Sequence, residues 1–103
     1  MVAPAPNLTR VTGRVRSSVP STSFDGWTEV EVVLDVVEPV PGLRSMVRSQ
    51  PGDVVTLAVA PGLLPDDPVG YHLDCRASVT PNGLRCEPHP VAEHFGVSAP
   101  PTG

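Results

Sequence analysis

The sequence contains no lysine and no isoleucine, and only four of its 103 residues are aromatic. Its seven basic residues are all arginine and stand against 11 acidic residues, which gives a formal net charge of −4. This balance argues against the broad basic surface that phosphate binding usually needs. The lack of lysine and isoleucine is typical of a high-GC genome, and we expect a bacterial or phage origin.

Long apolar segments are also missing. No stretch approaches the roughly 18 consecutive apolar residues of a membrane-spanning helix, so we expect no membrane association. The first residues lack the basic region and apolar run of a secretory signal. We therefore expect a cytoplasmic location, or a place in a particle assembled in the cytoplasm.

Proline and glycine are abundant, with 14 and nine residues respectively. This content argues against long helices. Clusters of turn-forming residues at 39–42, 61–68 and 80–83 separate short apolar runs, at spacings typical of a β-barrel or sandwich. The sequence therefore predicts an all-β protein.

A chain of 103 residues is long enough for one domain only. We expect a single β-barrel domain over residues 8–96. The Pro/Ala-rich arm at 1–7 and the tail at 97–103 have little to bury, so we expect both to be disordered unless a partner orders them.

Alternating apolar and polar residues predict the strands. The strongest pattern covers residues 28–38, and further strands are expected at 54–60 and 71–79. A first strand over residues 8–17 contains Gly13, which we expect to mark a β-bulge or a close packing contact.

Residues 80–83, TPNG, predict a tight turn, because proline fixes φ near −65° and the two residues after it tolerate left-handed geometry. We expect this turn to join two antiparallel strands. The register that matches apolar side chains and opposite charges pairs Val79 with Leu84, Ala77 with Cys86, Arg76 with Glu87 and Asp74 with His89.

Two segments resemble bacterial single-stranded-DNA-binding proteins, which are OB-fold barrels. Residues 7–15, NLTRVTGRV, are similar to their first strand, and residues 52–59, GDVVTLAV, are similar to one of their later strands. The resemblance implies a small five- or six-stranded OB-like barrel that binds single-stranded nucleic acid. Such proteins, however, stack bases on several exposed aromatic residues in a basic groove, whereas this chain is acidic and poor in aromatic residues.

Five residues are candidates for a binding surface: Arg10, Arg14 and Arg16 on the first strand, and Phe24 and Trp27 in the polar loop after it. Because consecutive strands usually pair, the three arginines are expected to lie opposite Glu29, Glu31 and Asp35. We therefore favour a surface of ion pairs over a nucleic-acid groove. The two aromatic residues are either a contact point or an anchor of the loop.

Two cysteines and two histidines form an HxxC…CxxH pattern made by His72, Cys75, Cys86 and His89. These are the donors of a structural zinc site, but residues three apart on a strand point to opposite faces. We predict buried free thiols and no zinc or other cofactor. A disulfide requires the hairpin register to slide by one pair. A divalent metal held on the outer face by His72, Asp74, Glu87 and His89 is a further alternative to ordinary cross-strand pairing.

No local motif ties a nucleophile to a base, and the sequence has no glycine-rich phosphate loop. We therefore hypothesise a non-enzymatic protein-binding or assembly module that contacts a protein partner or a second copy of itself. One alternative is an OB-fold single-stranded nucleic-acid-binding protein. The other is a small β-barrel enzyme with an internal pocket.

Overall fold

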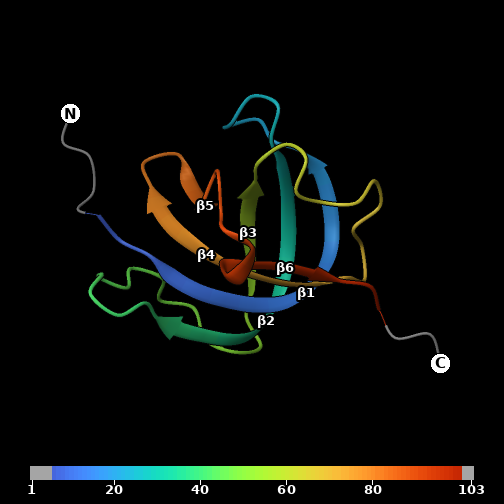
Figure 1. Ribbon diagram of the computed structural model, residues 1–103. Helices are drawn as coiled ribbons and strands as arrows, with labels where there is room; N and C mark the ends of the chain where they lie inside the picture. Colours follow the sequence, from blue (N-terminus) through green and yellow to red (C-terminus); the bar gives the residue numbers. More distant parts are fainter. Residues whose placement is uncertain (1–5, 101–103) are drawn as a thin grey trace.

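The computed structural model describes residues 6–100 and shows an all-β architecture (Figure 1). In chain order the elements are β1 (Thr9–Pro20), β2 (Thr28–Pro39), β3 (Val54–Val59), β4 (His72–Thr80), β5 (Gly83–Cys86), the 3₁₀ helix η1 (Ala92–His94) and β6 (Phe95–Ser98). Within these residues no helix has the length and apolar character needed to cross a membrane.

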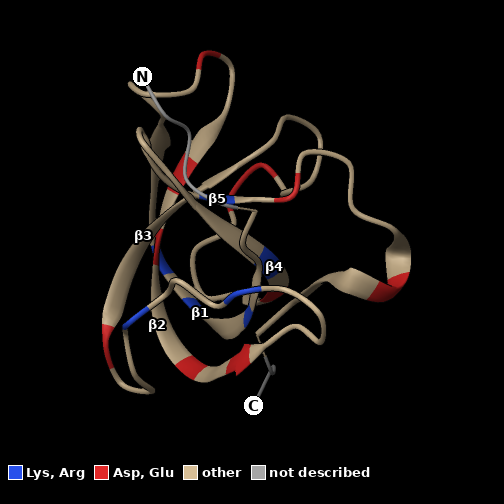
Figure 2. Ribbon diagram, turned by 90° about the vertical axis from the view of Figure 1, so that its left-hand side faces the viewer, with Lys and Arg blue, Asp and Glu red and all other residues tan. Residues whose placement is uncertain are grey.

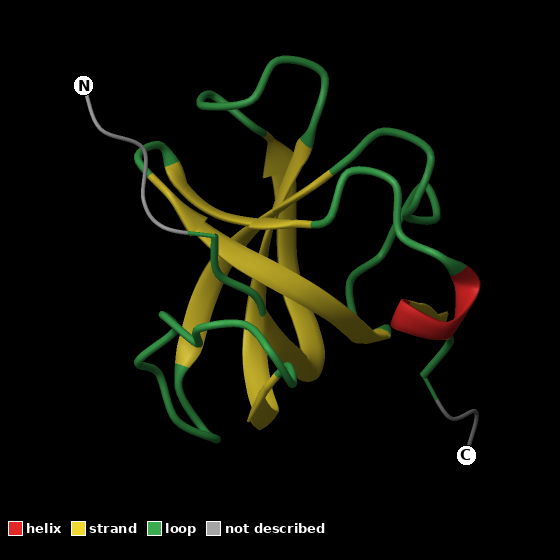
Figure 3. Ribbon diagram, turned by 60° about the vertical axis from the view of Figure 1, so that its left-hand side comes forward, coloured by secondary structure: helices red, strands yellow, loops and turns green. Residues whose placement is uncertain are grey.

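The strands form one six-stranded sheet with the order β1-β2-β3-β5-β4-β6, and β1 also pairs with β4. The first five strands therefore close into a barrel, which Figure 3 shows in yellow. The β3–β5 pairing is parallel and rests on Ala58 and Arg85, while the other pairings are antiparallel. The predicted all-β, OB-like barrel is confirmed. The sixth strand lies outside the barrel, beside β4.

The barrel interior is filled by the inward-facing side chains of alternating strand residues. Every strand except β6 contributes fully buried side chains: Val11, Val15, Val30, Val32, Leu34, Leu57, Val59, Leu73, Cys75, Ala77 and Cys86. Aromatic residues are absent from this set. The core is therefore built mainly from small and branched aliphatic side chains.

Gly13 lies where the register between β1 and β2 shifts, directly after Thr12. A Cβ atom at this position would clash with the carbonyl oxygen of Val33 and lie 2.6 Å from Cγ1 of Val32. The sequence-based expectation of a bulge or close packing is confirmed, since both occur here. A second shift, between Val15 and Ser17, leaves Arg16 outside the regular pairing.

The β4–β5 hairpin has the predicted register, with Ala77 opposite Cys86 and Val79 opposite Leu84. The backbone N–H of Glu87 also donates to the carbonyl of Arg76 (3.0 Å).

The predicted pairing of Asp74 with His89 is wrong, because β6 occupies this edge of β4 and places Gly96 opposite Asp74. Strand β5 ends at Cys86. Pro88 and Pro90 follow it, and they have no N–H with which to continue a ladder.

The folded region extends beyond the expected bounds of 8–96 at both ends. Asn7 is 9% exposed, and its side chain forms hydrogen bonds with both the N–H and the carbonyl of Val79 (2.8 and 3.1 Å). At the other end β6 continues to Ser98. The rest of the expected arm, up to residue 5, and the tail from residue 101 lie outside the described residues.

Candidate binding site

Arg10 lies at the centre of an ion-pair group on the outer face of β1. Its guanidinium donates two hydrogen bonds to the carboxylate of Asp74 (3.1 and 2.8 Å) and one to Glu38 (2.9 Å). The hydrogen bond and charge of Asp74, and then those of Glu38, raise the pKa of Arg10. Arg10 therefore links β4, β1 and β2 across the surface.

Arg16 pairs with Glu31 of β2 (Nε to Oε1, 3.2 Å), and the Ser17 hydroxyl donates to the same oxygen (2.8 Å). The hydrogen bond from Ser17, followed by that from Arg16, lowers the pKa of Glu31. Both Arg10 and Arg16 are thus engaged by carboxylates. Figure 2 shows basic and acidic positions interspersed along the ribbon.

The expected partners of the arginine row are correct only for Arg16. Arg10 lies opposite Glu38, and Arg14 lies opposite Val33. Arg10 has the same register as the pairs beside the β1–β2 loop, and this register places Glu38 opposite it. The two register shifts cancel each other and displace only the pairs between them, which include Arg14. Sequence alternation alone does not locate such shifts.

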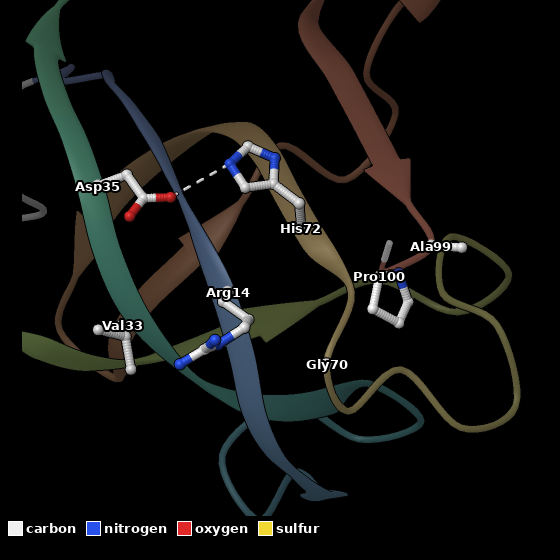
Figure 4. A pocket seen from close by; sticks show the side chains of 7 residues that line it. All are labelled: Arg14, Val33, Asp35, Gly70, His72, Ala99 and Pro100. Atoms are coloured by element: carbon white, nitrogen blue, oxygen red, sulfur yellow. Dashed lines mark ion pairs between the residues drawn. The ribbon is translucent and has the colours of Figure 1, made fainter. Parts of the chain in front are cut away.

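Arg14 lines a surface cavity of about 320 Å³ together with Val33, Asp35, Gly70, His72, Ala99 and Pro100 (Figure 4). Nε2 of His72 lies 3.3 Å from Oδ2 of Asp35, and both side chains are about half exposed. The cavity is open to solvent, and its charged groups carry opposite signs.

Phe24 and Trp27 lie in the loop between β1 and β2, with ring centroids 5.4 Å apart and an interplanar angle of 34°. The backbone closes this loop through the bonds from Ser21 N to Trp27 O (2.9 Å) and from Trp27 N to Phe24 O (3.1 Å). The Ser21 hydroxyl accepts the N–H of Phe24 (3.0 Å) and donates to Glu29 (2.9 Å). The aromatic pair is therefore held in a well-braced loop.

Arg85 of β5 completes a cluster with these two rings. Its guanidinium carbon lies 5.9 Å from the centroids of both Phe24 and Trp27, which is within the range of cation–π attraction. Its Nε atom is buried and has no hydrogen-bond partner among the described residues. We call Phe24, Trp27 and Arg85 the aromatic–arginine cluster.

Sequence reasoning identified the two aromatic residues but not Arg85. The alternation of the hairpin places Arg85 on the face opposite to Cys86, but no local pattern connects it with a loop about 60 residues earlier in the chain. Only the closure of the barrel brings β5 under this loop.

A small hollow of about 130 Å³ adjoins Phe24. Its walls come from the β1–β2 loop, from β2 and β3, and from the β4–β5 hairpin: Ser23, Phe24, Glu29, Thr56, Ala58, Asn82, Gly83 and Leu84. This combination of strands and loops is the face on which OB-type barrels bind their ligands. The cluster thus borders a hollow that lies between the β1–β2 loop and the β4–β5 hairpin.

The HxxC…CxxH residues are not brought together. Cys75 and Cys86 are buried free thiols, whereas His72 lies on the outer face with Asp35 and His89 is exposed beyond β5. The alternative outer group is also divided, because Asp74 is bonded to Arg10. Within residues 6–100 no group of three or more His, Cys, Asp or Glu side chains is placed to hold a metal ion.

The two thiols are in direct contact, with Sγ of Cys86 3.0 Å from Sγ of Cys75. The hydrogen bond to Cys75, followed by burial, raises the pKa of the Cys86 thiol. The sequence-based expectation of buried free thiols agrees with this arrangement. The direct contact between the two sulfur atoms was not expected from the sequence.

No match was found when the chain was compared with protein-family models, with curated proteins and with solved structures.

Proposed function

We propose that this chain is a non-enzymatic protein-binding or assembly module that contacts a protein partner, or a second copy of itself, through the aromatic–arginine cluster. The observation that carries this proposal is the position of half of the chain's four aromatic residues beside a cationic side chain on one face of the barrel. Tryptophan and arginine are among the residues that most often dominate the binding energy of protein interfaces.

The surroundings of the cluster support this role. Trp27 and Val19 line an adjacent hollow of about 440 Å³, and Val19 is 56% exposed. A partner that covers both side chains would remove apolar surface from water. Because hydrogen bonds from Ser21 already brace the loop, binding would order few additional residues.

Single-stranded nucleic-acid binding is the second candidate, because the cluster lies on the ligand face of an OB-like barrel and its rings are able to stack on bases. The distribution of charges on the protein argues against nucleic-acid binding. Arg10 and Arg16 are bonded to carboxylates, and the chain carries a net charge of −4. We therefore rank protein binding first.

Sedimentation velocity over a wide concentration range tests self-association, and affinity capture from an extract of the source cells tests a separate partner. We expect Trp27→Ala and Arg85→Ala to weaken the association about tenfold or more, as for other interface hot spots. Val91→Ala is the matched control, since Val91 is an exposed apolar residue outside the cluster, and it should bind like the wild type. Association that both cluster variants retain in full would overturn the proposal.

Titration with a fluorescent single-stranded oligonucleotide at low and moderate salt separates the two candidates. Emission from Trp27, which is the only tryptophan, provides a second signal from the cluster itself. Binding that weakens steeply with salt would favour the nucleic-acid function. No binding at low salt would remove it.

A further inference from the structure

Cys75 and Cys86 come from adjacent antiparallel strands and meet inside the barrel. The direct partner of Cys86 across the hairpin is Ala77, which is two residues from Cys75 and on the same face. The right-handed twist of paired strands shortens one of the diagonals between such positions. As a result the two sulfur atoms are 3.0 Å apart, although the cysteines are not direct cross-strand partners.

We propose that Cys75 and Cys86 form an oxidisable thiol pair, and that two-electron oxidation by a peroxide links β4 to β5 through a disulfide. The sulfur of one cysteine attacks an oxygen of hydrogen peroxide as its thiolate, the O–O bond breaks, and the proton lost by the thiol joins the leaving hydroxide, so that a sulfenic acid and one water are formed. The sulfur of the other cysteine then forms the S–S bond and displaces the sulfenic oxygen as a second water. The two thiols together lose two protons and two electrons, and the peroxide is reduced to two waters.

The geometry requires little rearrangement. A disulfide has an S–S distance of about 2.05 Å, so the sulfur atoms must approach by roughly 1 Å from their present 3.0 Å. Strand β5 has only four residues and is paired with β3 through the single pair Ala58–Arg85. Strand β4, in contrast, is held by β1 on one edge and by β5 and β6 on the other. We therefore expect β5 to supply the movement.

Both cysteines are fully buried, so the peroxide must reach them through local opening of the hairpin. Short strands with few pairing partners open at a lower free energy than the rest of a fold. Strand β5 is such a strand, because Ala58 and Arg85 are the only residues paired between β3 and β5. Oxidation should therefore proceed without global unfolding.

The contact also assigns an order to the two cysteines. Cys86 donates its S–H to the sulfur of Cys75, and a donated hydrogen bond stabilises a thiolate on the sulfur that accepts it. Cys75 is therefore the sulfur that attacks the peroxide, and Cys86 is the sulfur that resolves the sulfenic acid.

The first experiment treats the reduced, full-length, folded chain with hydrogen peroxide and follows its intact mass. We expect the monomer to lose two hydrogen atoms, to have no alkylatable thiol after denaturation and to regain both thiols with dithiothreitol. A closed loop restricts the unfolded chain, so the oxidised protein should also have a Tm higher by several degrees. Three results would overturn the proposal: addition of oxygen to the chain, formation of disulfide-linked dimers, or no reaction of the folded chain under conditions that oxidise the urea-unfolded chain.

Cys75→Ser and Cys86→Ser are the matched controls, because neither variant is able to form the internal bond. The expected result is oxygen addition at Cys75 in Cys86→Ser, at a rate at least several times that at Cys86 in Cys75→Ser. Equal rates, or faster addition in Cys75→Ser, would overturn the assigned order. Loss of two hydrogen atoms within either monomeric variant would show that the mass change does not come from this pair.

Discussion

Gly13 is a residue at which the backbone geometry leaves no room for a side chain. An added methyl group would meet the carbonyl oxygen of Val33 and Cγ1 of Val32, and β2 cannot withdraw because Val32 is part of the core. Glycine is needed here because a side chain would not fit, and not because of backbone conformation, since Gly13 is not among the glycines with positive φ.

We predict that Gly13→Ala lowers the free energy of unfolding by about 3 kcal/mol, at the upper end of the usual cost of overpacking. Urea denaturation of the two proteins measures this difference. Gly96→Ala is the control, because an added Cβ there would only reach ordinary contact with Asp74 at 4.0 Å. Equal losses in the two variants would show that the clash at Gly13 does not determine the effect.

Among the elements, the β1–β2 pair has a pH-sensitive contact at Glu31. Its pKa is lowered in the folded chain by the hydrogen bonds from Ser17 and Arg16. A lowered carboxyl pKa in the folded state means that the unfolded chain binds the proton more readily, so the contribution to stability is present above the unfolded pKa and is lost as the pH falls through the folded pKa.

We therefore predict that the Tm falls when the pH is lowered from near neutral to below the ordinary pKa of glutamate, about 4.3. The Tm of Glu31→Gln should fall less steeply over the same pH range, because this variant has no carboxylate to protonate at position 31. Thermal scans at a series of pH values, with Glu93→Gln as a control in η1, measure the two slopes. Identical slopes for the wild type and Glu31→Gln would contradict the prediction.

The β4–β5 hairpin depends on packing at its two cysteines. Replacing Cys75 and Cys86 together by alanine removes two buried sulfur atoms and leaves the outer face unchanged. We predict a loss of about 1–3 kcal/mol in the free energy of unfolding, measured by urea denaturation, with the fold retained.

Elemental analysis of the purified wild type provides the control for this prediction. A structural zinc site would supply folding free energy. One equivalent of zinc, together with failure of the double variant to fold, would therefore contradict the packing explanation.

At the scale of the whole molecule, Asn7 anchors the segment that precedes β1. Its side chain takes the place of a strand partner for Val79, which joins the start of the chain to the β4–β5 hairpin. Residues 2–6 consist of valine, alanine and proline, which carry little side-chain area to bury.

We predict that deletion of residues 2–6 leaves the Tm nearly unchanged and weakens association, because prolines lower the entropy cost of docking an extended arm. Deletion of residues 2–7 is the matched control. It also removes the hydrogen bonds of Asn7 to Val79 and should lower the Tm clearly. A large fall in Tm for the shorter deletion, with association unchanged, would count against this division.

Local sequence was sufficient to place β1 to β5, the turn at residues 80–83 and Gly13, but not β6. Each depends on a short-range rule: alternation for the strands, the conformational preferences of proline and glycine for the turn, and the absence of a Cβ for the bulge. The hairpin register followed in the same way, because Val79 and Leu84 had to share the apolar face. The position of Phe24 and Trp27 at the edge of a loop was also visible in the chain.

The tertiary structure alone decided which distant residues meet. Two compensating register shifts between β1 and β2 placed Arg14 opposite Val33 and left Arg16 outside the ladder, beside Glu31, because a bulge changes the pairs that follow it without a distinct residue pattern. Closure of the barrel placed Arg85 over the two aromatic rings, and strand twist brought the sulfur atoms of Cys75 and Cys86 to 3.0 Å. The contacts of Arg85 and Cys86 depend on the three-dimensional path of β5 between β3 and β4, and short-range preferences do not encode that path.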